Sequence, residues 1–285
     1  MKKLLLSLTT LCMLASCAEG GTPVSPRDAV LDAMTAVYEA GTYHQELRMS
    51  MSAEGETFSI TADADVDSAT RQVAMTMDLG MMGGEVEMVM DDGVIYMRSP
   101  VFEGAPTPWV SFDPSKMDPA TAARFGGFGA GTTDPSAYAG LFAGIFDVKA
   151  SGETDIDGIA TTRYTGTIDL QKVLEGFAEI VGDDADAETT EQLEAAVEQF
   201  EALGIDGDIP FQIWIDDDGL PRRQRITMDF GDLVPGAGDA QMEMTVDYSA
   251  FAEPVNVKRP KATEVTDITE VMNEGAAGEK SGAYG

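Results

Sequence analysis

Apolar and polar residues alternate along much of the chain from Tyr43 onward. Side chains at every second position are apolar, and those between them are polar. A period of two places one set on a buried face and the other on a wet face, as in half-buried β-strands. The strands predicted in this way cover 43–52, 57–67, 73–79, 86–90, 94–97, 109–112, a segment around Val148, 162–168, 209–215, 226–230 and 242–248.

Tight turns between these strands predict antiparallel pairing. Asp91-Asp92-Gly93 and Asp217-Asp218-Gly219 each place a glycine where a hairpin requires a positive φ. Strands joined by such turns form an antiparallel meander, which commonly has one wet face.

Helical spacing appears before the first strand and again in the middle of the chain. Ser25 and Pro26 begin a helix that ends before Gly41. Three further amphipathic helices are predicted over 134–145, 169–181 and 189–203. The pattern therefore predicts an α+β fold in a single domain, 25–261, followed by a flexible acidic tail, 262–285. The apolar face of the first helix holds Val30, Met34, Val37 and Tyr38.

The first residues have the pattern of an export signal. Residues 1–16 carry Lys2 and Lys3, an apolar run that is shorter than the roughly 20 residues of a bilayer span, and small residues before Cys17. Leu-Ala-Ser-Cys resembles a bacterial lipobox, in which Cys17 receives a palmitate-type diacylglyceryl group that anchors it to the outer face of the cytoplasmic membrane. Residues 17–24 would then be a tether. The alternative is an ordinary secretory signal with a chance cysteine.

The charge of the chain excludes one broad class of function. Fifty acidic residues against 18 Lys and Arg give a formal net charge of −32. Phosphate backbones are bound by clustered cations, so a non-specific nucleic-acid binder is excluded.

Methionine is concentrated at inward strand positions. Its flexible, polarizable side chain fills irregular gaps and is common on adaptable binding surfaces. Alternation alone is compatible with two structures. One is a solid core of adaptable side chains packed by helices, and the other is a cavity for acyl chains that is covered by helices. For the second, the candidate cavity residues are Met49, Met51, Ile60, Met75, Met77, Met88, Met90, Phe142, Leu174, Phe177, Phe211, Ile213, Met228, Met242 and Met244.

Several strand and turn motifs carry a resemblance to a known family. The motifs follow the lipobox and the early helix. They are Gly93 to Tyr96 with its partner run Trp109 to Phe112, Gly158 to Tyr164, and Ile213 to Asp216 followed by Gly219 to Arg223. Together they resemble the actinobacterial LppX/LprG lipoproteins, which are similar in fold to the LolA and LolB carriers. The resemblance implies a curved, half-open antiparallel β-barrel with helices on its concave face. It also implies a hydrophobic cavity that carries lipids or lipidated molecules across the envelope.

Catalytic and metal-binding patterns are missing from the sequence. His44 is the only histidine, there is no Gly-x-Ser-x-Gly motif, and no His/Cys cluster could hold zinc. The acidic runs at 183–186 and 216–219 lack the spacing of an EF-hand. The sequence leaves the role of two segments open. The Gly-rich segment 125–131 is either a flexible connection or a lid over the cavity. The basic cluster Arg222 to Arg225 either pairs with acidic residues across the strands or binds an anionic headgroup.

We therefore expect a monomeric, non-enzymatic envelope lipoprotein, without cofactor or metal, that binds an apolar ligand and passes it from a transporter or membrane to an acceptor. The alternative is a non-catalytic sensor or structural module that binds a protein partner through the half-barrel.

Overall fold

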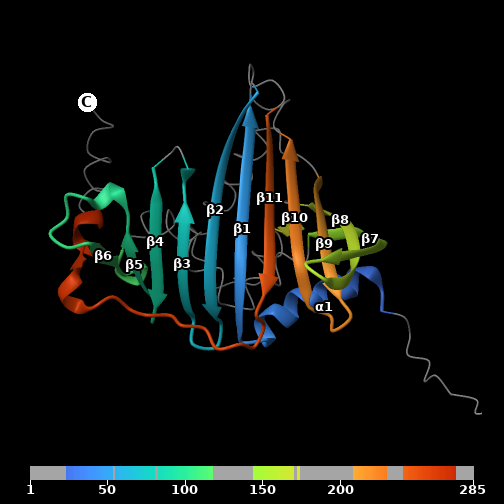
Figure 1. Cartoon of the computed structure of the whole chain (residues 1–285), viewed down its shortest axis with the longest axis horizontal. Coiled ribbons are helices and arrows are strands. Elements are labelled where there is room, and N and C mark those ends of the chain that lie inside the picture. Colours follow the sequence, from blue (N-terminus) through green and yellow to red (C-terminus); the bar gives the residue numbers. More distant parts are fainter. Residues whose placement is uncertain are drawn as a thin grey trace, which may run out of the picture.

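A 14-residue helix and a 12-stranded sheet make up most of the computed structural model, which describes residues 24–53, 55–80, 83–117, 144–169, 172–173, 208–229 and 240–273. The sheet is antiparallel except for its last pair, β6 and β12, and its strands are drawn side by side in Figure 1. The elements are α1 (Pro26–Glu39), β1 (Thr42–Ala53), β2 (Glu56–Asp67), β3 (Gln72–Asp78), β4 (Glu85–Asp91), β5 (Val94–Arg98), β6 (Trp109–Phe112), β7 (Ile145–Ile156), β8 (Ile159–Asp169), β9 (Asp208–Asp216), β10 (Pro221–Asp229), β11 (Gln241–Ser249) and β12 (Val265–Asp267), with 3-10 turns at Pro100–Phe102, Pro114–Lys116 and Ala262–Glu264.

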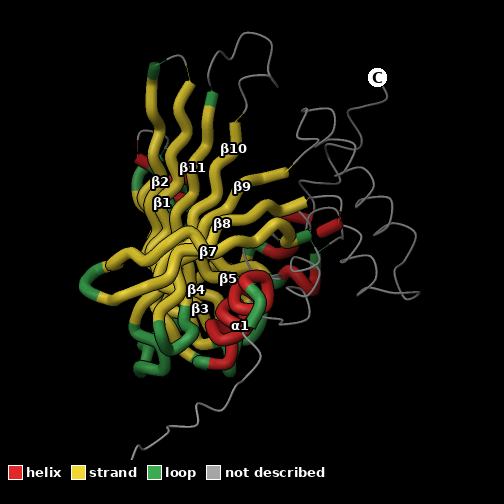
Figure 2. Tube along the Cα trace, turned by 90° about the vertical axis from the view of Figure 1, so that its right-hand side faces the viewer, coloured by secondary structure: helices red, strands yellow, loops and turns green. Residues whose placement is uncertain are grey.

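The strand order joins two meanders at the centre of the sheet. The order is β12-β6-β5-β4-β3-β2-β1-β11-β10-β9-β8-β7, so β1 pairs with β11, the last long strand. Register shifts between β7 and β8 and between β9 and β10 mark bulges, which increase twist and bend a sheet. Figure 2 shows the resulting curvature. The predicted α+β class with an open antiparallel sheet is confirmed.

The first helix begins and ends where the sequence predicts. The Ser25 hydroxyl accepts a hydrogen bond from the Asp28 backbone N–H at 3.1 Å, and Pro26 occupies the first turn. Gly41, at φ 77°, turns the chain into β1. Val30 and Val37 are buried, so the apolar face of α1 packs on the sheet.

The predicted hairpin turns are confirmed by backbone geometry. Asp92 and Gly93 both have positive φ, at 54° and 77°, as a two-residue turn between β4 and β5 requires. Gly219 has φ 81° between β9 and β10. These turns set the registers that sort side chains between the two faces of the sheet.

The two faces differ in chemistry, and we name them by their residues. The inner face carries Tyr43, Gln45 and Leu47 of β1 and packs under α1; the outer face carries His44, Glu46 and Arg48. Buried apolar residues form one cluster around Val66, Ile95 and Phe112 and another around Val30, Phe211 and Ile213.

Part of the central helical section lies outside the described residues. The Gly-rich segment 125–131 and the helix predicted over 189–203 lie outside. The helix predicted over 134–145 also lies outside, except for Gly144 and Ile145, where β7 begins. Of the helix predicted over 169–181, Lys172 and Val173 are described and helical, and the Asp169 carboxylate accepts a hydrogen bond from the Lys172 N–H at 3.1 Å. The signal, Cys17 and residues 274–285 are likewise outside. Within the described segments, no helix has both the length and the apolar character needed to cross a bilayer.

The folded domain extends beyond its expected end at residue 261. After β11 the chain runs along the lower edge of the sheet in Figure 1, where Arg259 pairs with Asp91 at 2.8 Å. Strand β12 then pairs with β6, and Thr266 bonds to Thr107 at 2.6 Å. The expectation of a flexible tail from residue 262 therefore needs correction as far as Asn273, because backbone pairing with β6 orders this segment.

A carboxylate in this C-terminal segment makes the fold sensitive to acid. The Thr269 hydroxyl and N–H, at 2.7 and 2.9 Å, lower the pKa of Asp267 from its usual 3.8. A depressed pKa contributes stability above the unfolded value and loses it as pH falls through the folded value. We expect Asp267→Asn to be less stable than the parent protein at pH 7, with the difference shrinking below pH 4. Urea unfolding at both pH values measures this; a pH-independent difference would contradict it.

Candidate functional site

A cavity of about 500 Å³ lies between α1 and the inner face of the sheet. This volume is within the range of ordinary small-molecule pockets, about 300–1,000 Å³. Its walls come from α1 and from strands on both sides of the β1/β11 pair, so the fold brings together segments far apart in sequence.

Helix α1 forms the roof of the cavity. Val30, Met34, Val37 and Tyr38 line it, which is the apolar face that the sequence predicts. Arg27 fixes the start of the helix, since its Nε donates to the Ile145 carbonyl oxygen at 2.9 Å. The helix is thereby tied to β7 at one end of the cavity.

Methionines form one wall. Met75 of β3 and Met88 of β4 lie opposite each other in register, and Met77 follows Met75 on the same face. Met88 is buried, whereas Met75 and Met77 are partly exposed. Because methionine side chains adapt their shape readily, this wall suits a flexible apolar ligand.

Branched and aromatic residues form the opposite wall. Phe211 and Ile213 of β9 are buried there, with Ile226 of β10, Ile168 of β8 and Ile145 of β7 beside them. This wall is stiffer than the methionine wall, because branched side chains have fewer rotamers.

The start of this stiff wall depends on a glycine. A Cβ on Gly144 would lie 2.6 Å from the Asp169 carbonyl oxygen and would collide with Val173. Since backbone cannot move aside cheaply, we expect Gly144→Ala to lower the free energy of unfolding by about 1–3 kcal/mol. Gly104→Ala, where a Cβ meets open space, is the matched control. Urea titrations of both variants test this, and equal midpoints would contradict it.

Six of the candidate cavity residues line the cavity, namely Met75, Met77, Met88, Phe211, Ile213 and Met244. The other nine are not among its described lining residues. Met90 is buried in the same cluster as Ile95 and Phe112 and does not line the cavity. Phe142, Leu174 and Phe177 lie outside the described residues. The remaining five, Met49, Met51, Ile60, Met228 and Met242, are partly or largely exposed on the sheet and do not line the cavity.

The length of α1 explains why these five residues lie apart. A helix of 14 residues spans about 21 Å, and α1 contacts β7, β9 and β10. The strand ends that carry Met51 and Met242, paired in register, extend farther along the sheet. Alternation assigns a residue to a face, but it does not say how far the covering helix reaches.

Polar lining residues were missed by the methionine criterion. Gln45, Gln224, Tyr248 and Tyr43 all line the cavity. The available signal was their position, because each occupies an inward place in an alternating strand where an apolar side chain is expected.

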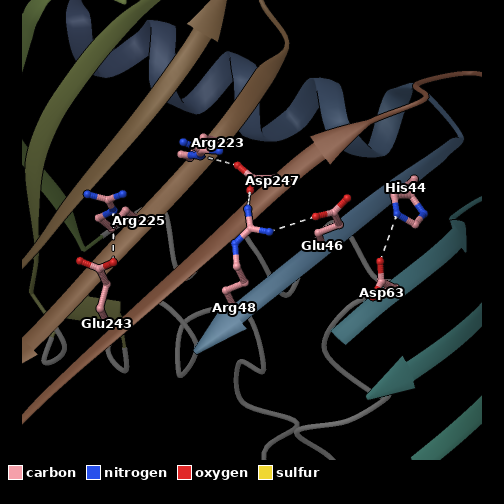
Figure 3. Close-up of polar contacts among 8 residues, drawn as sticks. All are labelled: His44, Glu46, Arg48, Asp63, Arg223, Arg225, Glu243 and Asp247. Atoms are coloured by element: carbon pink, nitrogen blue, oxygen red, sulfur yellow. Dashed lines mark hydrogen bonds and ion pairs between the residues drawn. The ribbon is translucent and has the colours of Figure 1, made fainter. Parts of the chain in front are cut away.

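The outer face carries an ion network, shown in Figure 3. Arg48 forms ion pairs with Glu46, at 3.0 Å, and with Asp247. Asp247 also pairs with Arg223. Arg225 pairs with Glu243 at 3.7 Å. The hydrogen bond to Asp247 raises the pKa of Arg223 above its ordinary value. The cross-strand pairing of these arginines is confirmed, and neither Arg223 nor Arg225 lines the cavity.

One group on the outer face has the residue types of a cation site. Ligand atoms of His44, Glu46 and Asp63 lie within 4.8 Å of one another, and Asp65 contacts His44 Nδ1 at 3.0 Å. Glu46 is already paired with Arg48. Exposed carboxylates gather in this way on many acidic surfaces, and we interpret these residues as part of the ion network.

A second hollow does not suit an apolar ligand. A groove of about 560 Å³ lies between β4, β5 and the 99–108 segment, and Glu85, Glu87, Arg98 and Glu103 contribute to its wall. Its charged lining contrasts with that of the cavity under α1, which we therefore take as the candidate site.

Comparisons with known proteins find distant similarity. No protein-family model matches the chain. An uncharacterized 31.2 kDa protein in the rplA-rplJ intergenic region of Streptomyces griseus is 27% identical over 131 residues, which are 46% of this chain and 38% of that protein. The chain thus matches less than half the length of this relative.

Solved lipoprotein structures are also similar to this chain. Lipoprotein LppX of Mycobacterium tuberculosis is 20% identical, with a TM-score of 0.48 over 82% of this chain and 98% of that chain. LprF of Mycobacterium bovis is 18% identical, with a TM-score of 0.45, and the match covers 83% of this chain and 97% of LprF. LppX, whose family the sequence resembles, is thus among the similar structures. Because these likenesses are distant, we base the function on the cavity.

Proposed function

We propose that this protein is a non-enzymatic carrier of apolar ligands, a lipid or a lipidated molecule, anchored in the bacterial envelope through Cys17. The observation that carries the proposal is the cavity of about 500 Å³ under α1, whose lining is mainly aliphatic and aromatic. Such a cavity replaces the bilayer as the place where acyl chains avoid water, at roughly 25 cal/mol for each Å² of apolar surface buried.

The methionine wall supports transfer as well as binding. A carrier must admit and release its ligand, and Met75 and Met77 are partly exposed and unbranched. Flexible side chains can repack around a ligand of changing position without a unique fit. A lipid attached to Cys17 would keep this cavity beside the membrane, where donor and acceptor molecules are found.

A transfer assay between vesicles tests the proposal. Donor vesicles contain a self-quenched fluorescent acyl lipid, and acceptor vesicles contain none. The protein is the chain from residue 17 onward with Cys17→Ala, which carries neither the apolar signal nor a lipid and so needs no detergent. We expect the rate of dequenching to rise in proportion to protein concentration. A rate that stays at the value of the vesicles alone would contradict a carrier function.

One observation favours the alternative of a partner-binding module. Met51 and Phe58, opposite each other on β1 and β2, are 46% and 37% exposed. Exposed apolar side chains at the end of a sheet are suited to a protein partner. In that case the vesicle assay would show no transfer, although the fold would be intact.

A further inference from the structure

Methionines gather on the inner face where β1, β11 and β10 extend past the cavity. Met49 of β1 lies directly opposite Met244 of β11, and Met51 lies opposite Met242. Met242 is also opposite Met228 of β10. The upper ends of these three strands in Figure 1 carry the group. We call Met49, Met51, Met242 and Met244 the methionine square.

The spacing of the square lets its sulfur atoms meet. Directly opposite residues of an antiparallel pair have Cβ atoms about 4.5–5.5 Å apart, and residues two positions apart on one strand are separated by roughly 6.5–7 Å. A methionine side chain is unbranched and has three rotatable bonds, so its sulfur can reach toward a neighbour. The thioethers of the square can therefore surround a single small ion.

The square is open to solvent. Met51 is 46% exposed, and the other three residues of the square are partly exposed. Strand positions favour β-branched and aromatic side chains, which pack well on a pleated surface. Strand propensity therefore gives no reason for methionine at all four positions, whereas a requirement for accessible sulfur does.

Thioether sulfur is selective for soft cations. Methionine binds Cu(I), whereas Ca²⁺ and Mg²⁺ require oxygen ligands. The inner-face residues opposite the square, Phe58 and Ile60 of β2 and Ile226 of β10, are apolar. A divalent ion would lose its hydration there without gaining a negative partner, and this cost is smaller for a monovalent ion. The formal net charge of −32 favours the approach of any cation.

We propose that the methionine square is a Cu(I) site, in which the thioether sulfurs coordinate the ion and Met228 lies beside Met242 as a further donor. The ion enters and leaves as Cu(I), so no electron is transferred. This inference goes beyond the carrier function and does not depend on it, because Met49, Met51, Met228 and Met242 do not line the cavity.

A titration followed by NMR tests the site directly. The protein is the chain from residue 17 onward with Cys17→Ala, which contains no cysteine, so no thiolate competes for the metal. It is labelled with ¹³C at the methionine methyl groups, and Cu(I) is added as its acetonitrile complex under nitrogen. We expect the methyl signals of the square to shift together and to saturate at one ion per protein. The signals of the buried Met88 and Met90 should stay in place, and Ca²⁺ should shift none of the square.

Paired substitutions locate the site. Met51→Leu with Met242→Leu keeps apolar side chains of similar volume, and it should weaken Cu(I) binding at least about tenfold without changing acyl-probe affinity. Met90→Leu with Met97→Leu, on β4 and β5 and also outside the cavity lining, is the matched control and should bind Cu(I) as the parent does.

Two results would overturn the copper site and leave the carrier function standing. One is a set of square methyl signals that Cu(I) does not shift, and the other is equal Cu(I) affinity in the two paired variants. A protein that binds Cu(I) at the square and takes up no acyl probe would instead contradict the carrier function alone.

Discussion

Asp216→Ala should lower the free energy of unfolding by about 3–5 kcal/mol, the largest effect of any single change considered for this fold. The Asp216 side chain is 4% exposed, and its carboxylate accepts hydrogen bonds from the Asp218 and Leu220 N–H groups at 3.0 and 2.9 Å. Its second oxygen holds Arg222 Nε and Nη2 at 2.7 and 2.6 Å. Alanine would leave the guanidinium of Arg222, which is only 17% exposed, and two backbone amides without their partner.

The matched control for this change is Asp217→Ala in the same turn, where the side chain is exposed and the effect should be within about 0.5 kcal/mol. Urea unfolding monitored by tryptophan fluorescence measures both. A loss below about 1 kcal/mol for Asp216→Ala would mean that the turn does not depend on this carboxylate. The result bears on the cavity, because Arg222 stacks over Phe251, which contacts the ring of Tyr43 in the cavity wall.

Filling the cavity should abolish ligand uptake without unfolding the protein. Leu47 and Val246 lie opposite each other on β1 and β11, line the cavity and are only partly buried. Replacing Leu47→Trp and Val246→Trp would place two bulky indole rings in the cavity of about 500 Å³ and leave less room for an acyl chain. We expect acyl-probe affinity to fall at least about tenfold, with a stability change of about 1–3 kcal/mol or less.

A tryptophan on the opposite face controls for the cavity-filling variant. Thr61→Trp places the ring on the exposed outer side of β2, beside Arg48, and should leave uptake unchanged. Equilibrium titration with a fluorescent fatty acyl probe reports affinity, and circular dichroism reports folding. Unchanged affinity in the filled variant would show that the probe binds somewhere other than under α1.

The local elements could be predicted from the sequence because their signals are local. Ser25-Pro26 and Gly41 define α1, and the positive φ of Asp92 and Gly93 follows from the Asp-Gly dipeptide. Alternation of polar and apolar residues assigned the inner and outer faces of β1 to β5 correctly, since a period of two leaves no other choice.

The pairing of β1 with β11 could not be predicted in the same way. It joins His44 to Ser249 across the whole length of the domain, and no turn sequence connects the two strands. The continuation into β12 was missed for a similar reason, because a three-residue strand pairing with β6 leaves almost no periodic signal.

The candidate site could be predicted only in part. Met75, Met88 and Met244 were found by their inward positions and unusual type, whereas Met49 and Met242 have the same pattern and lie beyond the cavity. Gln45 and Gln224 were overlooked because the criterion sought apolar residues. The difference between a solid core and a cavity depends on where α1 lies across the sheet, and this is a tertiary property.

The contrast between surface and cavity is consistent with a carrier. The chain has a formal net charge of −32, yet the described cavity lining has no charged residue. Acidic groups on the outer face keep the protein soluble and repel anionic surfaces. Burial of an uncharged ligand inside avoids the desolvation cost that any ionised group would face there.

The measurement that tests the central claim most directly is native mass spectrometry combined with organic extraction. The chain from residue 17 onward, with Cys17→Ala, is exported behind a cleavable secretory signal and purified without detergent. We predict a stoichiometric bound lipid that is lost when Leu47→Trp and Val246→Trp fill the cavity and retained in Thr61→Trp. A clean apo mass that takes up no acyl probe would contradict the carrier function and favour a module that binds a protein partner.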